Sequence, residues 1–331
     1  MIRRTAKGLG MIAVAAILLA LPALVNVPYF LHLAVLSLVW VIVAVGLNVI
    51  QGYTGYVSIA QAGFMGVGAY VSALAALRLA WPVWGSLPLG FVGAAIAGLV
   101  VGYPSLRVRG HYFAIVTLAY NMVIWILLVN VDWLTGGDAG LPGIPRPEAI
   151  WLPGGYTIGF RTRGGYYYLA LALAALAVAG VRRLARSRVG RVLVAIRQNE
   201  ALASAAGIPC WKYKLGAFVV SAAYAGVAGG LYAHYTGFIN PSPFNVDSSL
   251  NAILAVILGG SGTLTGPVLG AFILVLLPEY LRIAQVFRLI AYGLILIVIT
   301  IYLPRGLAPI LASGARRLPW MSTPDASTDE P

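Results

Sequence analysis

Residues 31–50, LHLAVLSLVWVIVAVGLNVI, contain no Asp, Glu, Lys or Arg, and they lie within 70 consecutive residues, 8–77, that also lack these four types. A helix needs about 20 apolar residues to cross the hydrocarbon core of a bilayer. The stretch is therefore long enough for more than one crossing. Because a backbone in lipid must satisfy its own hydrogen bonds, these crossings are predicted to be helical. The alternating segments of about ten residues that mark a membrane β-barrel are absent from the sequence.

The composition of the whole chain extends this prediction. Its 331 residues are 60% hydrophobic and 9% charged, whereas about a quarter of the residues of a soluble domain are charged. From the charge-free runs we predict an all-α, polytopic transmembrane bundle of about ten helices, within a range of about eight to eleven. The predicted crossings are 9–27, 30–50, 64–79, 86–103, 111–131, 166–181, 214–236, 248–260, 264–282 and 287–303.

The distribution of basic residues orients this bundle. With the N-terminus inside, 16 of the 22 Lys and Arg residues fall on the cytoplasmic side against four acids, and the outer segments carry six bases and five acids. This asymmetry follows the positive-inside rule. The rule also accounts for the net charge of +13 without a nucleic-acid partner. Both termini are therefore predicted to be cytoplasmic.

The sequence offers little for catalysis. It has one cysteine, Cys210, no CxxC or HExxH spacing and no Gly-x-x-x-x-Gly-Lys-[Ser/Thr] nucleotide loop. We therefore predict no bound metal, no cofactor and no enzymatic activity for this chain. No charged residue falls deep inside a predicted crossing, which argues against a proton-driven carrier.

A basic island, RRLARSRVGRVLVAIRQNEALASAAGIPCWKYK, occupies residues 182–214 between apolar runs. After a polar break at 187–190, the sequence from Arg191 to Ala206 predicts one cytoplasmic helix of about four turns. Gly207 suits the C-terminal cap of this helix, and Pro209 stops its continuation. Two roles fit such a helix: it lies on anionic lipid, or it docks a partner protein. The pattern favours docking.

Two Gly-rich segments interrupt the apolar runs, QGYTGYVSIAQAGFMGVG (51–68) and GGSGTLTGPVLG (259–270). Gly-interrupted hydrophobic segments are typical of broken helices that line a solute pathway. The polar side chains of the first segment either line this pathway or satisfy backbone groups freed by the break. The candidate pathway residues are Gln51, Gly52, Gly55, Ser58, Gln61, Gly259, Gly260 and Gly262.

Small residues recur at every fourth position in several helices, a spacing that lets helix backbones approach closely in lipid. The stripes are Ala222/Gly226/Gly230, Gly90/Ala94/Gly98 and Gly262/Gly266/Gly270. We favour packing within this chain over a subunit interface for these stripes. The organisation predicted from the sequence is one transmembrane domain, 1–310, and a polar tail, 311–331, that we expect to be disordered. Within the domain, 182–213 forms a cytoplasmic loop and 132–165 an outer loop rich in turns.

Six strings, taken together in order and spacing, resemble one family: the LivM-type permease subunits of branched-chain amino acid ABC importers. The resemblance covers about residues 46–307. The strings are GLNVIQGYTGYVSIAQAGFMGVGAY (46–70), RGHYFAIVTLAY (109–120), LTGGDAGLPGIP (134–145), GRVLVAIRQNEALASAAGIPCWKYKLGAFVVSAAYAGVAGGLYAH (190–234), PSPFNVDSSLNAILAVILGGSGTLTGPVLGAF (241–272) and YLPRGL (302–307).

The resemblance implies a subunit of an importer in the bacterial or archaeal cytoplasmic (inner) membrane. Its expected partners are a second, LivH-like permease, two cytoplasmic LivG/LivF-like ATPases that bind ATP and Mg²⁺, and a periplasmic solute-binding protein, besides membrane lipid. Relatives import urea or amides and aromatic or aliphatic acids, so the solute stays open. An autonomous carrier or channel, and a structural anchoring subunit, are the competing classes. The residues expected to couple the permease to the ATPases are Gly190, Arg191, Ile196, Arg197, Glu200, Ala201, Ala203 and Gly207.

Overall fold

The structure, a computed structural model, describes residues 18–22, 28–108, 110–151, 157–160 and 162–281, with short pieces at 293–294, 297, 301–302 and 306–308. Its main helices are α2 (Pro28–Thr54), α3 (Gln61–Arg78), α4 (Val83–Ser105), α5 (His111–Asn130), α6 (Asp132–Thr135), α7 (Arg163–Arg186), α8 (Arg188–Gln198), α9 (Glu200–Ala205), α10 (Cys210–Thr236), α11 (Val246–Gly259) and α12 (Gly266–Tyr280). Two 3-10 turns, η1 (Gly137–Ala139) and η2 (Ser242–Phe244), join them.

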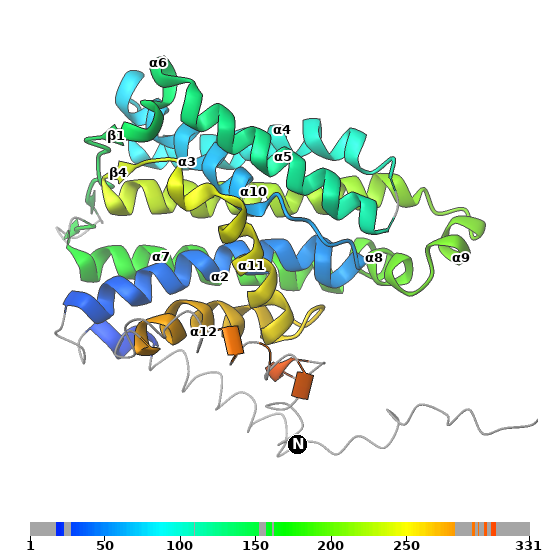
Figure 1. The fold of residues 1–331 in the computed structure, drawn as a ribbon. Helices are drawn as coiled ribbons and strands as arrows, with labels where there is room; N and C mark the ends of the chain where they lie inside the picture. The colour runs from blue at the N-terminus through cyan, green and yellow to red at the C-terminus, as the bar shows by residue number, and fades with distance from the viewer. Residues whose placement is uncertain are drawn as a thin grey trace, which may run out of the picture.

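The long helices run along a common direction, as Figure 1 shows. Helices α8 and α9 lie at one end of the bundle, and α6, β1 and β4 lie at the opposite end. The only strands in the described residues are two short antiparallel pairs: β1 (Leu141–Pro142) with β4 (Phe238–Ile239), and β2 (Ile150–Trp151) with β3 (Thr157–Ile158). The chain is thus an all-helical bundle whose short connections gather at its ends.

Helix α10 lies at the centre of the bundle and packs on α2, α3 and α4. Glycines allow this packing, because a Cβ on Gly68 would lie 2.2 Å from Cα of Gly226, and a Cβ on Gly226 would lie 2.5 Å from the carbonyl oxygen of Gly90. A Cβ on Gly90 would in turn lie 2.8 Å from the carbonyl oxygen of Gly68. The prediction that the small-residue stripes of α4 and α10 pack within the chain is confirmed.

Eight of the predicted crossings, from 30–50 to 264–282, coincide with helices of the structure. Five of these helices are long and apolar enough to span a membrane, namely α2, α4, α5, α7 and α10, whereas the apolar helices α11 and α12 are shorter. The predicted first and last crossings, 9–27 and 287–303, lie largely outside the described residues. The total of about ten crossings therefore stays a prediction.

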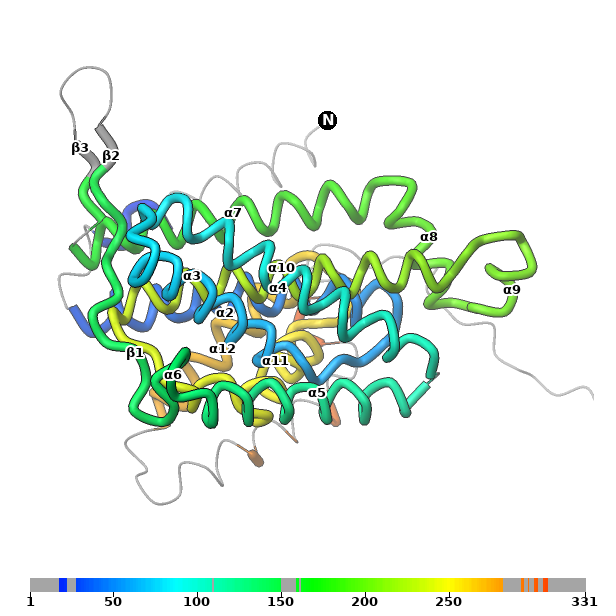
Figure 2. Tube along the Cα trace, turned by 90° about the horizontal axis from the view of Figure 1, so that it is seen from above, coloured from blue at the N-terminus to red at the C-terminus, as the bar shows by residue number. Residues whose placement is uncertain are grey.

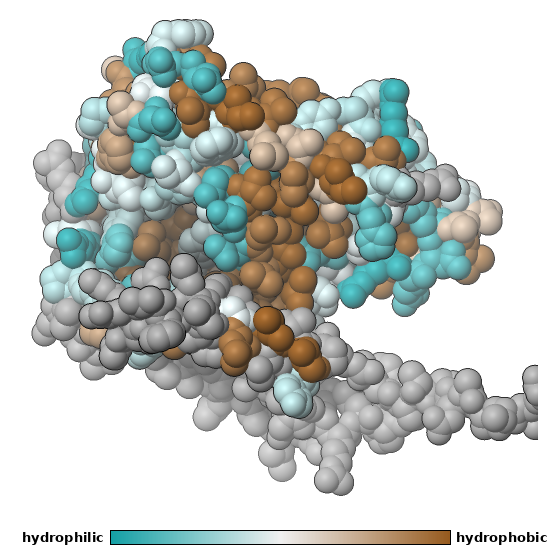
Figure 3. All heavy atoms as spheres, in the orientation of Figure 1, coloured by the Kyte–Doolittle hydropathy of each residue, from teal (hydrophilic) through white to brown (hydrophobic). Residues whose placement is uncertain are grey.

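The surface supports a membrane location. Figure 3 shows apolar residues gathered over the middle of the bundle, with hydrophilic residues toward its two ends. Large apolar side chains on α4 and α5, such as Val100 and Ile115, are exposed in the isolated chain. An apolar belt of this kind between polar ends is what a bilayer requires of the protein that crosses it.

The basic island differs from its prediction, because the single helix expected from Arg191 to Ala206 is wrong. Asn199 adopts an extended conformation (φ −158°, ψ 103°), and its Oδ1 accepts a hydrogen bond of 2.9 Å from the Leu202 amide. An asparagine in this role ends one helix and caps the next. The polar break predicted at 187–190 also shrinks to Ser187, because α7 continues to Arg186.

The two Gly-rich segments contain the two interruptions next to α2 and α12. Residues 55–60 separate α2 from α3, and residues 260–265 separate α11 from α12. Gly55 (φ +79°), Gly260 (φ +116°) and Gly262 (φ +79°) hold left-handed conformations that favour glycine. We call these interruptions the first break (55–60) and the second break (260–265).

Candidate functional site

Helix α8 lies at the end of the bundle, and α9 extends beyond it (Figure 2). Their inward side is apolar, since Leu193, Ile196 and Ala203 are buried, the last two beside Cys210. Their outward side exposes Leu202, which is 69% exposed, and Trp211, at the start of α10, is 50% exposed. These exposed apolar side chains are accessible for contact with another protein.

Glu200 pairs with the body of the bundle. Nζ of Lys214 on α10 lies 2.6 Å from Glu200 Oε1, and the Tyr56 hydroxyl donates to Glu200 Oε2 at 2.6 Å. Lys214 also donates to the Tyr56 oxygen at 3.0 Å, which closes a three-membered cluster. Burial raises the pKa of the Tyr56 hydroxyl, which therefore stays protonated and available as a donor. The cluster fixes the start of α9 to α10 and to the first break.

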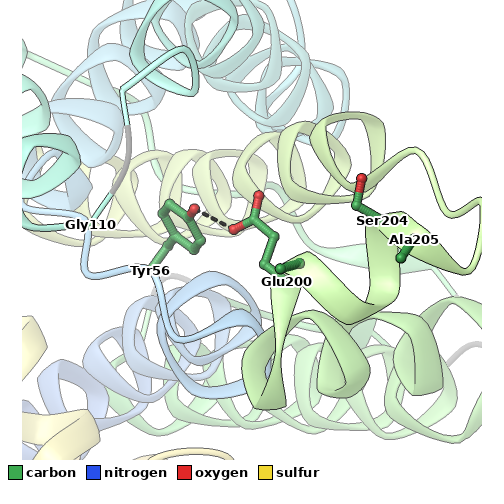
Figure 4. A pocket seen from close by; sticks show the side chains of 6 residues that line it. Tyr56, Gly110, Glu200, Ser204 and Ala205 are labelled. Carbon is green, nitrogen blue, oxygen red and sulfur yellow. Dashed lines mark hydrogen bonds between the residues drawn. The ribbon is translucent and has the colours of Figure 1, made fainter.

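A cavity of about 630 Å³ opens beside this cluster, where Figure 4 shows the Tyr56–Glu200 hydrogen bond at its wall. Small side chains of α9 form the wall on one side, and the chain just before α5 closes the other. The lining residues are Tyr56, Gly110, Glu200, Ala201, Ser204 and Ala205.

Removal of one partner from the Tyr56–Glu200–Lys214 cluster is expected to destabilise this end of the bundle. In Glu200→Gln, the almost fully buried Lys214 ammonium loses its counter-charge, a change that costs about 1–3 kcal/mol when a buried group is left unpaired. We expect a lower thermal unfolding temperature of the purified protein, and recovery in the double variant Glu200→Gln/Lys214→Met. Equal unfolding temperatures for Glu200→Gln and the wild type would contradict the role given to this pair.

Arg197 connects α8 to the end of α2 and to both breaks. In the first break, a Cβ on Gly55 would lie 3.4 Å from Arg197 Cγ. Nη1 of Arg197 donates to the carbonyl oxygen of Gly52, in the last turn of α2, at 2.5 Å. The same guanidinium lies against Gly262 in the second break, where a Cβ would come within 2.4 Å of Nη1. A cation at a helix C-terminus also interacts favourably with the helix dipole. The guanidinium of Arg197 therefore faces the membrane domain. In this way a predicted coupling residue, Arg197, contacts two predicted pathway residues, Gly52 and Gly262.

Asn48 fixes α2 to the second break. Its Nδ2 donates to the Thr263 carbonyl oxygen at 2.8 Å, and its Oδ1 accepts from the Gly262 amide at 2.9 Å. A Cβ on Gly52 would collide with this carboxamide, since it would lie 1.9 Å from Oδ1. The end of α2, the second break and Arg197 thus form one connected unit.

Gln61 is satisfied by the protein itself. Its Nε2 donates to the carbonyl oxygens of Val43 and Ser221 at 3.3 and 3.2 Å, and its Oε1 accepts from the Ser221 hydroxyl at 3.1 Å. Ser58 accepts locally from the Ala60 amide at 3.4 Å. The sequence left open whether these side chains line the solute pathway or hydrogen-bond to backbone groups. For Gln61 and Ser58, this geometry favours hydrogen bonding to the backbone.

The N-terminus of α3 is capped by side chains that sequence reasoning missed. The Ile59 amide donates to Thr117 Oγ1 at 3.1 Å, the Ala62 amide to Ser249 Oγ at 2.8 Å, and the Gly63 amide to Asn121 Oδ1 at 2.6 Å. Asn121 lies ten residues after the start of α5, which is about 15 Å along that helix. Helix α3 therefore begins inside the bundle.

Comparison with known proteins fits this arrangement of broken helices and a projecting helical pair. Residues 29–303 match the family model described as branched-chain amino acid transport system, permease component. The chain belongs to this permease family. It is 34% identical over 295 residues to the high-affinity branched-chain amino acid transport system permease protein LivM of Escherichia coli K12. This alignment covers 84% of this chain and 69% of that protein.

More distant relatives include both kinds of permease named in the family. The probable LivM permease of Methanocaldococcus jannaschii is 29% identical over 245 residues, or 68% of this chain and 69% of that protein. The LivH permease of Salmonella typhimurium is 29% identical over 248 residues, or 71% of this chain and 79% of that protein. No solved structure matches the chain.

In this permease the predicted coupling residues divide into two groups. Gly190, Ile196 and Ala203 are buried, and the side chains of Arg197 and Glu200 bond inward. The exposed members are Arg191, Arg197, Ala201 and Gly207, and Arg197 among them directs its guanidinium inward to the Gly52 carbonyl oxygen. The pattern Thr117–Asn121, two polar residues four apart in an apolar run, was a sequence signal for the missed caps of α3.

Proposed function

We propose that this chain is the membrane-spanning permease subunit of an ATP-driven importer of branched-chain or related neutral amino acids. Family membership and the similarity to the LivM and LivH permeases support this proposal. The structural observation that carries it is the path from the projecting α8–α9 pair, through Arg197, to both breaks. A pair of helices outside the membrane that contacts two interruptions inside it can transmit movement between them.

The excess of basic residues supports a cytoplasmic position for α8 and α9 in the inner membrane, with the membrane domain spanning 1–310 and the tail 311–331 on the same side. The chain lacks a nucleotide-binding loop, so two ATPase subunits supply hydrolysis from separate polypeptides. A second permease of the LivH kind completes the membrane unit, and a periplasmic binding protein delivers the solute. No cofactor is bound by this chain.

The mechanism is alternating access. ATP-driven closure of the ATPases shifts α8 and α9, and the hydrogen-bonded cluster of Tyr56, Glu200 and Lys214 makes these helices move with α10. Arg197 carries the shift to Gly52 and Gly262, and the positive-φ glycines of the two breaks, such as Gly55 and Gly262, permit the backbone to change direction. The pathway for the solute then opens on one side of the membrane at a time.

Affinity purification of this chain from native membranes in mild detergent, followed by mass spectrometry, tests the proposal. We expect two P-loop ATPases and a second permease in the wild-type sample. Leu202→Arg is expected to lower ATPase recovery at least about tenfold, since it places a charge in the apolar contact surface while changing no internal contact of a side chain that is 69% exposed.

The matched control is Trp133→Arg, which replaces a 75% exposed side chain at the opposite end of the bundle. This control is expected to retain the ATPases. Recovery of the wild-type chain alone, in a detergent that preserves other importers, would favour an autonomous carrier. That class is then checked by uptake into ATP-depleted vesicles.

A further inference from the structure

Two helix N-termini meet at Asn121. The first-turn amide of Gly63 on α3 donates to Asn121 Oδ1, and Ser249 in the first turn of α11 donates to the same oxygen at 3.2 Å. Ser249 also accepts from the Ala62 amide and so joins the starts of the two helices directly. Helix N-termini carry partial positive charge. The carboxamide of Asn121 thus lies inside the bundle, where two positive helix ends converge.

The donor half of this carboxamide has no partner among the described residues. Asn121 is 0% exposed, and both of its hydrogen bonds go to Oδ1, whereas Nδ2 bonds to no atom in the part of the chain that the structure describes. Gln61, nearby at the start of α3, contrasts with it, because both its oxygen and its nitrogen are bonded. Buried side-chain amides are nearly always paired. A free amide donor at two positive helix ends is complementary to an anionic acceptor.

The side chains packed around Asn121 are apolar. A Cβ on Gly63 would lie 3.3 Å from Ile124 Cδ1, and one on Gly66 would lie 2.9 Å from Leu128 Cδ1 and 3.0 Å from Phe244 Cβ. Helix α3 is thus in close contact with α5 and η2, and this apolar wall admits a solute only when these elements separate during translocation. A carboxylate on a short aliphatic or aromatic body matches one polar donor within such an apolar wall. In transporters, the N-termini of discontinuous helices point at anionic groups of the solute.

We propose that Asn121 Nδ2, together with the N-termini of α3 and α11, binds the carboxylate of the amino-acid solute during translocation. This inference rests on the proposed function and deepens it, because it assigns a solute-binding residue that lies outside both breaks. The site recognises the group that all α-amino acids share. Side-chain selectivity therefore belongs to the apolar wall or to the binding protein.

The test is uptake of radiolabelled leucine by proteoliposomes that contain the complete importer and saturating binding protein. Asn121→Asp keeps an oxygen that caps Gly63 and accepts from Ser249, but it replaces the amide donor by a second carboxylate oxygen. We expect the maximal uptake rate to fall at least about tenfold, while the ATPase activity and the unfolding temperature of the complex match those of Thr117→Val. That control removes a different cap of α3, at Ile59, and leaves Asn121 intact.

If Asn121→Asp does not assemble, Asn121→Ala is compared with Ser249→Ala. Both variants remove one bond to the start of α3, but only the first removes the donor. Uptake that is equal in the members of either pair would overturn the carboxylate site. Failure of the wild-type importer to transport any amino acid would instead overturn the proposed function, so the two failures are distinguishable.

Discussion

Replacement of Arg197 by alanine is expected to lower ATP-driven solute uptake at least about tenfold, while the ATPase subunits remain bound and continue to hydrolyse ATP. The variant loses a charge-assisted hydrogen bond from α8 to the Gly52 carbonyl oxygen. Bonds of this type contribute about 1.5–3 kcal/mol, and about 1.4 kcal/mol corresponds to a tenfold change in an equilibrium constant. The measurement is the ratio of solute transported to ATP hydrolysed in proteoliposomes.

Two further variants sharpen this test. Arg197→Lys keeps the charge and one donor and is expected to recover part of the uptake, although an ammonium cannot reproduce the planar guanidinium. Arg188→Ala removes an exposed arginine from the same helix that is not among the predicted coupling residues, and it serves as the matched control. If Arg197→Ala releases the ATPases from the membrane, Arg197 belongs to the docking surface and the assignment as an internal link is wrong.

Gly262→Ala is expected to impair uptake as strongly as the loss of Arg197. A methyl group at this position would lie 2.4 Å from Nη1 of Arg197 and 2.9 Å from the Gly52 carbonyl oxygen, so it would expel the guanidinium from its acceptor. The backbone at φ +79° adds strain, since a non-glycine residue in the left-handed region costs about 1–2 kcal/mol. Uptake in proteoliposomes, normalised to the amount of folded protein, is the measurement.

Gly216→Ala on α10 is the control for this substitution, because a Cβ there would meet nothing within 4 Å. The double variant Gly262→Ala/Arg197→Ala provides a second check. Since both changes remove the same contact, their effects on uptake should be strongly less than additive. Full additivity would show that the two residues act independently and would contradict a shared link.

The sequence predicted the helical bundle well because its signal is local. Charge-free runs such as 79–106 mark apolar helices directly, and eight of the predicted crossings coincide with helices in the described residues. The split at Asn199 was missed for a local reason as well. Good helix formers on both sides favoured continuity, whereas the asparagine side chain competes with the helix for the Leu202 amide.

The candidate site was predicted less well because its contacts join distant parts of the chain. Arg197 and Glu200 were selected as coupling residues from the composition of the island and the family resemblance, but their partners Gly52 and Tyr56 lie about 145 residues earlier. The presence of a polar residue in a Gly-rich segment also does not reveal whether its side chain is already hydrogen-bonded within the protein. Gln61 was therefore selected although it is internally bonded, and Asn121 was overlooked in an apolar run.

The mutual contact of Gly68, Gly90 and Gly226 has a consequence for genetics. At this crossing three main chains touch without an intervening side chain, so even one added methyl group separates the helices. Random mutagenesis scored by growth on an imported nutrient would place these glycines among the most intolerant positions. Such alleles would resemble transport mutants, but the missing step would be biogenesis, and the protein would be removed by quality-control proteases before reaching any solute.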